Sequence, residues 1–187
     1  MENSIFISYT DYNILDARIP VLARQENGKF KFTDCYFIEF FIKPGDETSR
    51  KINMICKPFI YKTAIKYIIS KHDFLSDNAL RLFLLVEPNA IKNNFHETDD
   101  LLAIALCLDG SQNTFIQYFE VNYKFRHSYE PNQKYRRVGT SAANALKKFY
   151  HASELCGESA LDAIKFWLKN GFTRPDNHDL HLHLCHR

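Results

Sequence analysis

The chain has 187 residues, which is enough for one domain with a sizeable core and too few for two comfortable ones. Apolar residues make up 45% of the sequence and charged residues 25%, a balance that is typical of a folded soluble protein and excludes intrinsic disorder. The net charge of +2 is too small for a general nucleic-acid binder.

The five cysteines are widely spaced and form no Cys-x-x-Cys pair, so neither a disulfide framework nor a zinc knuckle is indicated. We therefore predict reduced and mostly buried thiols. Residues 1–10 lack a basic segment followed by a long apolar one, and no stretch approaches the roughly 18 apolar residues that span a bilayer. A cytoplasmic protein without a membrane segment fits these features, and a host-delivered effector with an unusual secretion signal would share them.

Strand and helix patterns alternate in the first half of the chain. Residues 4–9 predict a short strand, and Asp11 is placed to cap a helical segment that reaches Arg18. The run 29–42 is rich in aromatic residues and isoleucine and predicts a strand that stops at a turn. Residues 58–72 then predict a helix whose buried face holds Ile60, Ala64, Tyr67 and Ile68.

Three strand-like runs follow, over residues 79–87, 101–108 and 115–123. The second and third runs are joined across Asp109-Gly110, a favourable turn pair. We therefore expect these two strands to form an antiparallel hairpin.

A basic loop and an amphipathic helix come next, over residues 134–150. The apolar residues of this helix recur at helical spacing: Ala142, Ala145, Leu146 and Phe149. A helix start has unpaired backbone N–H groups and the positive end of the helix dipole, and Arg136 and Arg137 add charge beside Gly139. This stretch therefore predicts an anion site of the kind that binds phosphate.

The chain closes with a short strand at 154–158, a helix at 160–170 that Gly171 is placed to end, and a final half-buried strand. The inward residues of the helix are expected to be Leu161, Ile164 and Leu168. In the final strand His181 and His183 alternate with leucines, which is the pattern of the polar face of an edge strand. We expect no metal site there, because no carboxylate or cysteine is spaced to complete one.

Two segments carry a resemblance to a known family. Residues 135–141, Tyr-Arg-Arg-Val-Gly-Thr-Ser, are similar to the acetyl-CoA loop of the Gcn5-related N-acetyltransferase superfamily, Arg/Gln-x-x-Gly-x-Gly/Ala. Residues 163–172, Ala-Ile-Lys-Phe-Trp-Leu-Lys-Asn-Gly-Phe, resemble the closing pattern of that family, Ala-x-x-Phe-Tyr-x-x-x-Gly-Phe. The match extends over residues 57–187, whereas residues 1–56 are poorly matched. The resemblance implies one α+β domain over residues 1–187, with a mixed, mostly antiparallel central sheet flanked by helices.

The resemblance also implies that acetyl-CoA is the acyl donor. The loop amides would cradle its pyrophosphate, and the end of the preceding strand would offer backbone groups to its pantetheine arm. The donor-binding residues implied in this way are Val121, Arg136, Arg137, Val138, Gly139, Thr140, Ser141, Ala142, Phe166 and Trp167. Glu120, on the same strand as Val121, is our candidate for the general base that takes a proton from the acceptor amine, directly or through water.

Four positions depart from the family pattern. Arg137 stands where the family often has glycine, Ser141 replaces the second motif glycine, and Ala160 stands where asparagine is frequent. Trp167 occupies the place of the tyrosine that often protonates the leaving thiolate, and an indole N–H cannot act as an acid near neutral pH. Other tyrosines could take over that role, and the candidates are Tyr123, Tyr129 and Tyr150.

Three functions are compatible with these patterns. The first is acetyl transfer from acetyl-CoA to an amine by direct attack in a ternary complex. The second is a catalytically silent CoA-binding or protein-interaction module on the same fold. The third is acetyl transfer to an RNA-linked amine, because basic and aromatic residues mix between Lys124 and Arg137. Nucleic acid is not favoured as a partner, and the acceptor is not identified by the sequence. An inferred insertion at 127–133 could contact it, and a homodimer through the final strand is left open.

Overall fold

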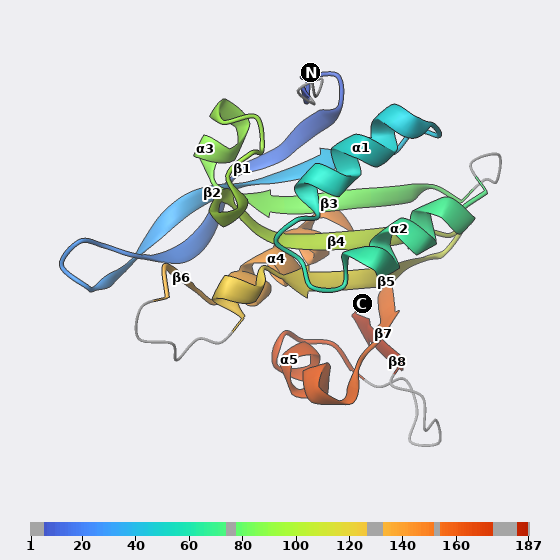
Figure 1. Ribbon diagram of the computed structural model, residues 1–187. Coiled ribbons are helices and arrows are strands. Elements are labelled where there is room, and N and C mark those ends of the chain that lie inside the picture. Colours follow the sequence, from blue (N-terminus) through green and yellow to red (C-terminus); the bar gives the residue numbers. More distant parts are fainter. Residues whose placement is uncertain (1–5, 74–77, 127–132, 152–153, 174–182, 187) are drawn as a thin grey trace.

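One eight-stranded sheet runs through the described part of the chain, in the order β6-β1-β2-β3-β4-β5-β7-β8 (Figure 1). The computed structural model describes residues 6–73, 78–126, 133–151, 154–173 and 183–186. The strands are β1 (Tyr12–Arg24), β2 (Phe30–Phe40), β3 (Leu80–Val86), β4 (Leu101–Asp109), β5 (Asn113–Val121), β6 (Tyr135–Arg136), β7 (Glu154–Glu158) and β8 (His183–His186). The helices are α1 (Asp46–Ile55), α2 (Lys62–Lys71), α3 (Pro88–Lys92), α4 (Val138–Phe149) and α5 (Ile164–Lys169). Short 3₁₀ turns cover Thr98–Asp100, Tyr123–Phe125 and Leu161–Ala163.

The sheet is antiparallel except where β5 meets β7. These two strands pair in parallel from Asn113 and Glu154 to Ile116 and Gly157. Strand β5 then continues to Val121 without β7 beside it. The two strands therefore separate, and we call the opening between Gln117–Val121 and the end of β7 the β5–β7 split.

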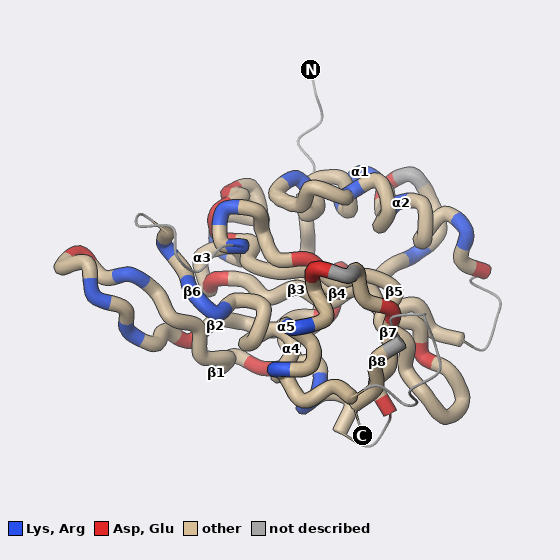
Figure 2. The backbone as a smooth tube through the Cα atoms, turned by 90° about the horizontal axis from the view of Figure 1, so that it is seen from below, with Lys and Arg blue, Asp and Glu red and all other residues tan. Residues whose placement is uncertain are grey.

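Helices cover both faces of the sheet, so the chain buries two apolar clusters. On one face, Ile38, Leu84 and Leu106 pack with α1 and α2. On the other, Phe83 and Ala103 pack with α4 and Trp167 of α5. Figure 2 shows α1 and α2 on the opposite side of the sheet from α4. Because successive residues of a strand point to opposite faces, the continuous apolar runs of β3 and β4 are explained by burial on both sides.

The strands predicted from residue 29 onward and the two C-terminal helices are present. The runs 29–42, 79–87 and 154–158 contain β2, β3 and β7, and the runs 101–108 and 115–123 overlap β4 and β5, which form the expected antiparallel hairpin. Helix α4 follows the basic loop, and Gly171, with φ of 86°, follows α5 in the left-handed conformation expected beyond a helix end. The final strand is present from His183, and the rest of the predicted strand lies outside the described residues.

The predictions for the N-terminal region are wrong in three places. Residues 6–8 form no strand in the described region, and residues 12–18 belong to β1 instead of a helix. The pairing of β1 with β2 decides this outcome, because it buries Ile19 and Val21 in the sheet core. These residues are two positions apart, which is the spacing of residues on one face of a strand. Helix α1 was not predicted at all, although its apolar residues Ile52 and Ile55 are three positions apart.

The predicted helix at 58–72 is shorter than expected and rotated about its axis. Helix α2 begins at Lys62, so Pro58 is not in its first turn. Ile65 is its buried residue, whereas Tyr67, expected to face inward, is 64% exposed. In the C-terminal helix Leu168, also expected to face inward, is exposed, and Trp167 is the buried residue.

The prediction that every cysteine is reduced is also wrong. Cys156 of β7 and Cys185 of β8 are directly opposite each other in the antiparallel pair and form a disulfide. The two cysteines are 29 residues apart in sequence, and this spacing does not predict a disulfide, since only the β7–β8 register brings them together. Cys35, Cys56 and Cys107 are free and buried, as expected.

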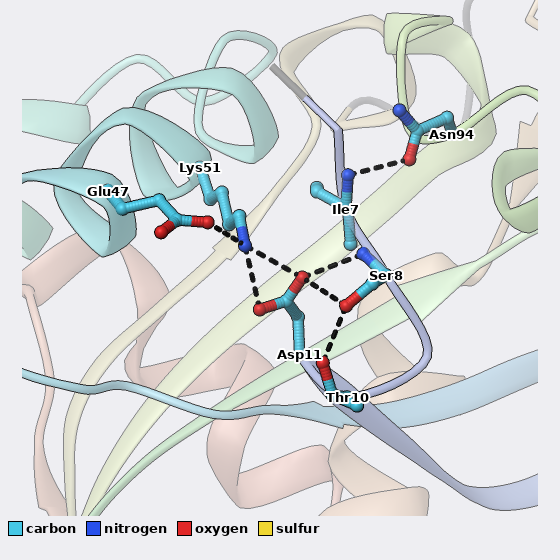
Figure 3. A network of polar contacts seen from close by, with 7 residues as sticks. All are labelled: Ile7, Ser8, Thr10, Asp11, Glu47, Lys51 and Asn94. Atoms are coloured by element: carbon cyan, nitrogen blue, oxygen red, sulfur yellow. Dashed lines mark hydrogen bonds and ion pairs between the residues drawn. The ribbon is translucent and has the colours of Figure 1, made fainter.

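A partly buried ion pair ties the N-terminal turn to α1 (Figure 3). Lys51 Nζ lies 2.9 Å from both carboxylate oxygens of Asp11 and 2.7 Å from Glu47. The Asp11 carboxylate also accepts the N–H of Ser8 at 2.7 Å. Burial by itself would raise the pKa of Asp11, but the hydrogen bonds from Lys51 and Ser8 outweigh it and lower that pKa.

Replacing Asp11 by asparagine should lower the free energy of unfolding by about 1–3 kcal/mol, because it leaves the Lys51 ammonium without its buried partner. The Asp11 pKa is depressed by folding, so the stabilisation is complete above the unfolded-state value of about 4 and is lost as pH falls through the lower folded value. Urea unfolding of both proteins should therefore show a constant difference between pH 5 and 7 and a shrinking one below about pH 4. Glu47→Gln is the control, because Glu47 is 82% exposed and should contribute much less. An equal loss in the two variants would contradict this account.

Candidate functional site

The β5–β7 split contains a pocket of about 200 Å³. All residues from Ile116 to Glu120 line it on the β5 side, and those from Gly157 to Ala160 line it on the other. Since neighbouring residues of a strand point to opposite faces, a pocket that touches five in a row passes from one face of the sheet to the other. Phe119 faces the α4 and α5 side, whereas Tyr118 packs on the α1 and α2 side.

The start of α4 has unsatisfied backbone donors. The first intrahelical bond of this helix that joins residues four apart runs from Ser141 N to Arg137 O at 3.0 Å. The N–H groups of Val138, Gly139 and Thr140 precede it and have no helical acceptor. Within the described part of the chain no side chain caps this end, and its first turn contains no acidic residue. An anion is the ligand that such a helix start favours.

Gly139 is where the helix start meets the β5–β7 split. A Cβ atom added to Gly139 would lie 3.0 Å from Phe166 Cε2 and 3.2 Å from Val121 Cγ2. Three predicted donor-binding residues from β5, α4 and α5 thus lie against one another, and only glycine allows this approach. Trp167 continues the same surface, with its ring centroid 5.0 Å from those of Phe166 and Phe119. Val138 and Ala142 are buried in the core beneath the helix.

The two arginines of the loop point to different surroundings. The Arg136 guanidinium carbon lies 4.0 Å from the Phe30 ring centroid, on the β1–β2 hairpin. Arg137 is exposed at the N-cap position, directly before α4, so its charge is beside the unpaired amides. The Ser141 hydroxyl donates to Pro20 O at 2.6 Å and ties α4 to β1.

Arg137 has φ of 57° and ψ of 22°, the left-handed conformation in which glycine is unstrained. Arg137→Gly should therefore raise the free energy of unfolding by about 1 kcal/mol. If the charge of Arg137 assists a bound phosphate, the same change should weaken CoA binding by about 3–10-fold, and the loss should shrink at high salt. Urea unfolding and calorimetric titration with CoA at two salt concentrations measure the two effects. Arg137→Gln, which keeps the strain and removes the charge, should weaken binding without the gain in stability, and a gain there would refute the conformational explanation.

Glu120, the predicted general base, lies in the pocket with 4% of its surface exposed. Its Oε1 accepts the N–H of Ile60 at 2.9 Å, and its Oε2 accepts the N–H of Tyr61 at 3.3 Å and the hydroxyl of Tyr118. Strand β5 therefore holds the carboxylate against the segment between α1 and α2. A carboxylate has about four lone-pair positions, so one on Oε1 is left for a substrate or a water.

The tyrosines proposed to replace the missing acid are not at this pocket in the described structure. The Tyr150 hydroxyl donates to Asp109 Oδ1 at 2.8 Å, at the far end of β4, and Tyr123 is exposed beyond β5. Tyr129 lies outside the described residues. The pocket is lined instead by Tyr61 and Tyr118, which the sequence reasoning missed. Tyr118 could have been found, since it is two residues before Glu120 and so on the same face of β5.

Charged and polar residues that were not predicted also line the pocket: Arg126, Glu158, Ser159 and Asp162. Ala160, which stands in place of the frequent asparagine, is part of the same wall. The pocket at the β5–β7 split thus joins residues 116–120 and Arg126 to residues 157–160, 162 and 163, which are far from them in sequence.

A group of three metal-ligating side chains occurs in the described structure, formed by Glu154, Cys156 and Cys185. The two sulfur atoms are bonded to each other, so as they stand they do not offer two thiolates. Burial raises the pKa of both Cys35 and Cys56 to about 12, which makes these thiols poor nucleophiles. None of the described helices is both long and apolar enough to cross a membrane.

The basic stretch from Lys124 to Arg137 is partly neutralised. Lys124 Nζ pairs with Asp99 at 2.5 Å and Lys134 Nζ with Glu87 at 3.3 Å, and residues 127–132 lie outside the described structure. Figure 2 shows Asp and Glu interspersed with Lys and Arg over the molecule.

The final strand β8, through which a homodimer was considered, has part of its edge covered. Thr173 exchanges two backbone hydrogen bonds with Cys185 of this strand. The RNA-linked acceptor and the homodimer stay predictions.

The comparisons with known proteins give matches in three-dimensional structure. No family sequence model matches the chain, and no curated protein matches it by sequence. The catalytic domain of Tetrahymena Gcn5 histone acetyltransferase, solved in complex with coenzyme A, superposes with a TM-score of 0.50 at 11% identity, over 80% of this chain and 91% of that one. Escherichia coli ElaA superposes with a TM-score of 0.48 at 15% identity, over 75% of this chain and 90% of that one. The strand order, the parallel pair that separates and the superposition on Gcn5 show that this chain has the Gcn5-related N-acetyltransferase-like fold.

Proposed function

We propose that the chain is an N-acetyltransferase that moves an acetyl group from acetyl-CoA to an amine within a ternary complex. The observation that carries the proposal is the pocket through the β5–β7 split. At the α4 and α5 face, the uncapped helix start and the Gly139–Val121–Phe166 contact suit a phosphate-bearing donor. At the opposite face, Glu120 is a carboxylate within reach of an acceptor.

The chemistry needs two sites that meet at one point. The amine nitrogen attacks the thioester carbonyl carbon, an N–C bond forms, and the C–S bond breaks. The acceptor arrives as an ammonium ion, so two protons must leave its nitrogen. One passes to Glu120 and then to solvent, and the other ends on the sulfur of CoA.

The residue that protonates sulfur is not assigned. Trp167 lies in the pocket wall and its indole N–H is no acid near neutral pH. A thiol with an ordinary pKa of about 8.5 leaves tolerably as a thiolate, so a dedicated acid is not indispensable for turnover.

Thermal unfolding with and without acetyl-CoA is the first test. A donor at 100 times its dissociation constant should add about 2.7 kcal/mol to the stability. Release of free thiol in the presence of a panel of primary amines then tests transfer. An unchanged melting temperature at millimolar acetyl-CoA would refute the proposal.

The presence of Trp167 where the family has tyrosine also favours a second candidate, a CoA-binding module without activity. Thermal stabilisation by acetyl-CoA together with no thiol release over the whole amine panel would select this candidate. An RNA-linked amine would instead be revealed by transfer to aminoacyl-RNA that declines steeply with salt.

A further inference from the structure

We infer that Tyr118 is a positioning residue that holds the Glu120 carboxylate and orients it toward the acceptor. The inference rests on the proposed function in its catalytic consequence but not in its structural one. Its basis is the set of three donors that converge on one buried carboxylate in the pocket.

Two of these donors belong to the backbone, the N–H groups of Ile60 and Tyr61, where α1 leads into α2. Tyr118 supplies the third from its side chain, two residues before Glu120 on β5. It is the donor that a substitution can remove while the polypeptide backbone stays in place. The Tyr118 ring is half-buried and packs against the α1 and α2 cluster, so phenylalanine fits the same space.

The protonation state of Tyr118 follows from burial and charge. Burial, the hydrogen bond to Glu120 and the negative charge of that carboxylate all raise the pKa of Tyr118. Tyr118 is therefore a neutral donor at physiological pH and a poor proton source for the leaving sulfur.

The hydrogen bond also selects which oxygen faces the acceptor. Oε2 accepts from both Tyr118 and Tyr61, whereas Oε1 accepts only from Ile60 in the described structure. Oε1 keeps the free lone pair and is the oxygen that would take the proton. Without Tyr118 the carboxylate loses the donor that distinguishes its two oxygens.

The experiment compares the carbon-13 chemical shift of the Glu120 carboxyl at one pH in the wild type and in Tyr118→Phe, with Glu120→Gln identifying the resonance. The resonance should move in Tyr118→Phe, because the carboxylate loses a hydrogen bond. The value of kcat/KM should fall by about 10–100-fold, as expected for the loss of one hydrogen bond to a charged group, while the dissociation constant for CoA stays within about twofold. Tyr67→Phe, on the exposed surface of α2, is the control and should change neither the resonance nor kcat/KM.

The outcomes separate the two proposals. A Glu120 resonance that is the same in wild type and Tyr118→Phe overturns the role of Tyr118, whatever the activity. A shifted resonance in a protein that binds no CoA and acetylates no amine supports the positioning role and refutes the proposed function. A shifted resonance with an unchanged kcat/KM shows that the orientation of Glu120 does not matter for the reaction and overturns the catalytic part of the inference. A melting temperature of Tyr118→Phe close to that of the wild type verifies that the fold is retained.

Discussion

Glu120→Gln should lower kcat/KM for acetyl transfer by about 10²–10⁴-fold while the dissociation constant for CoA stays within about twofold. The glutamine side chain has nearly the same shape and can still accept the N–H of Ile60 through its oxygen. It cannot take a proton, so attack must rely on the small fraction of acceptor that is already neutral. Steady-state kinetics and calorimetric titration with CoA separate the two effects.

The pH dependence of this variant gives a sharper test than a single rate. A free alkylamine has a pKa near 10.4, so the acceptor deprotonates by itself as pH approaches 10. The deficit of Glu120→Gln relative to wild type should therefore shrink as pH rises. Asp162→Asn removes another carboxylate from the same pocket and should cost less than about tenfold, since a general charge effect is weaker than the loss of a base. Equal losses in the two variants, or a deficit independent of pH, would exclude Glu120 as the base.

Gly139→Val should weaken CoA binding by about 100-fold and leave the protein folded. The first atom of any side chain would already be 3.0 Å from Phe166 Cε2 and 3.2 Å from Val121 Cγ2. Two further methyl groups must displace the Phe166 ring and the Val121 side chain or occupy the space in front of the helix amides. Overpacking of this kind costs about 1–3 kcal/mol, equivalent to as much as about 100-fold in affinity. Gly139→Ala should give an intermediate loss, because only Cβ is added.

Thermal unfolding with and without CoA measures the effect of the Gly139 substitutions, and circular dichroism checks the fold. Asn144→Val is the matched control, because it introduces the same β-branched residue at an exposed position of α4. Normal CoA affinity in Gly139→Val would place the donor somewhere other than the start of α4. Equal weakening in Asn144→Val would mean that loss of helix stability, and not the contact at Gly139, is responsible.

Much of the fold could be predicted from local patterns. The strands β2, β3, β4 and β5 are long runs of β-branched, aromatic and leucine residues, and the Asp109-Gly110 turn sets the β4–β5 hairpin. Strand β1 escaped prediction because its first residues fit a helical period as well as a strand period. Only pairing with β2 buries Ile19 and Val21 and decides between the two.

The residues of the candidate site likewise fall into those that the sequence indicates and those that only the tertiary structure brings together. The sequence by itself determined the glycine at the helix start and the aromatic pair Phe166 and Trp167, because each belongs to a local motif. It pointed to Glu120 only through the resemblance of its strand to the active-site strand of the family. Only the tertiary structure decided that Gly139, Val121 and Phe166 lie in contact, that the backbone of Ile60 and Tyr61 and the hydroxyl of Tyr118 bind Glu120, and that Arg136 stacks on Phe30. It also decided the Cys156–Cys185 bond through the β7–β8 register. The physical reason is that these contacts join residues far apart along the chain, and their geometry follows from strand register and from the separation of β5 and β7, which no local pattern encodes.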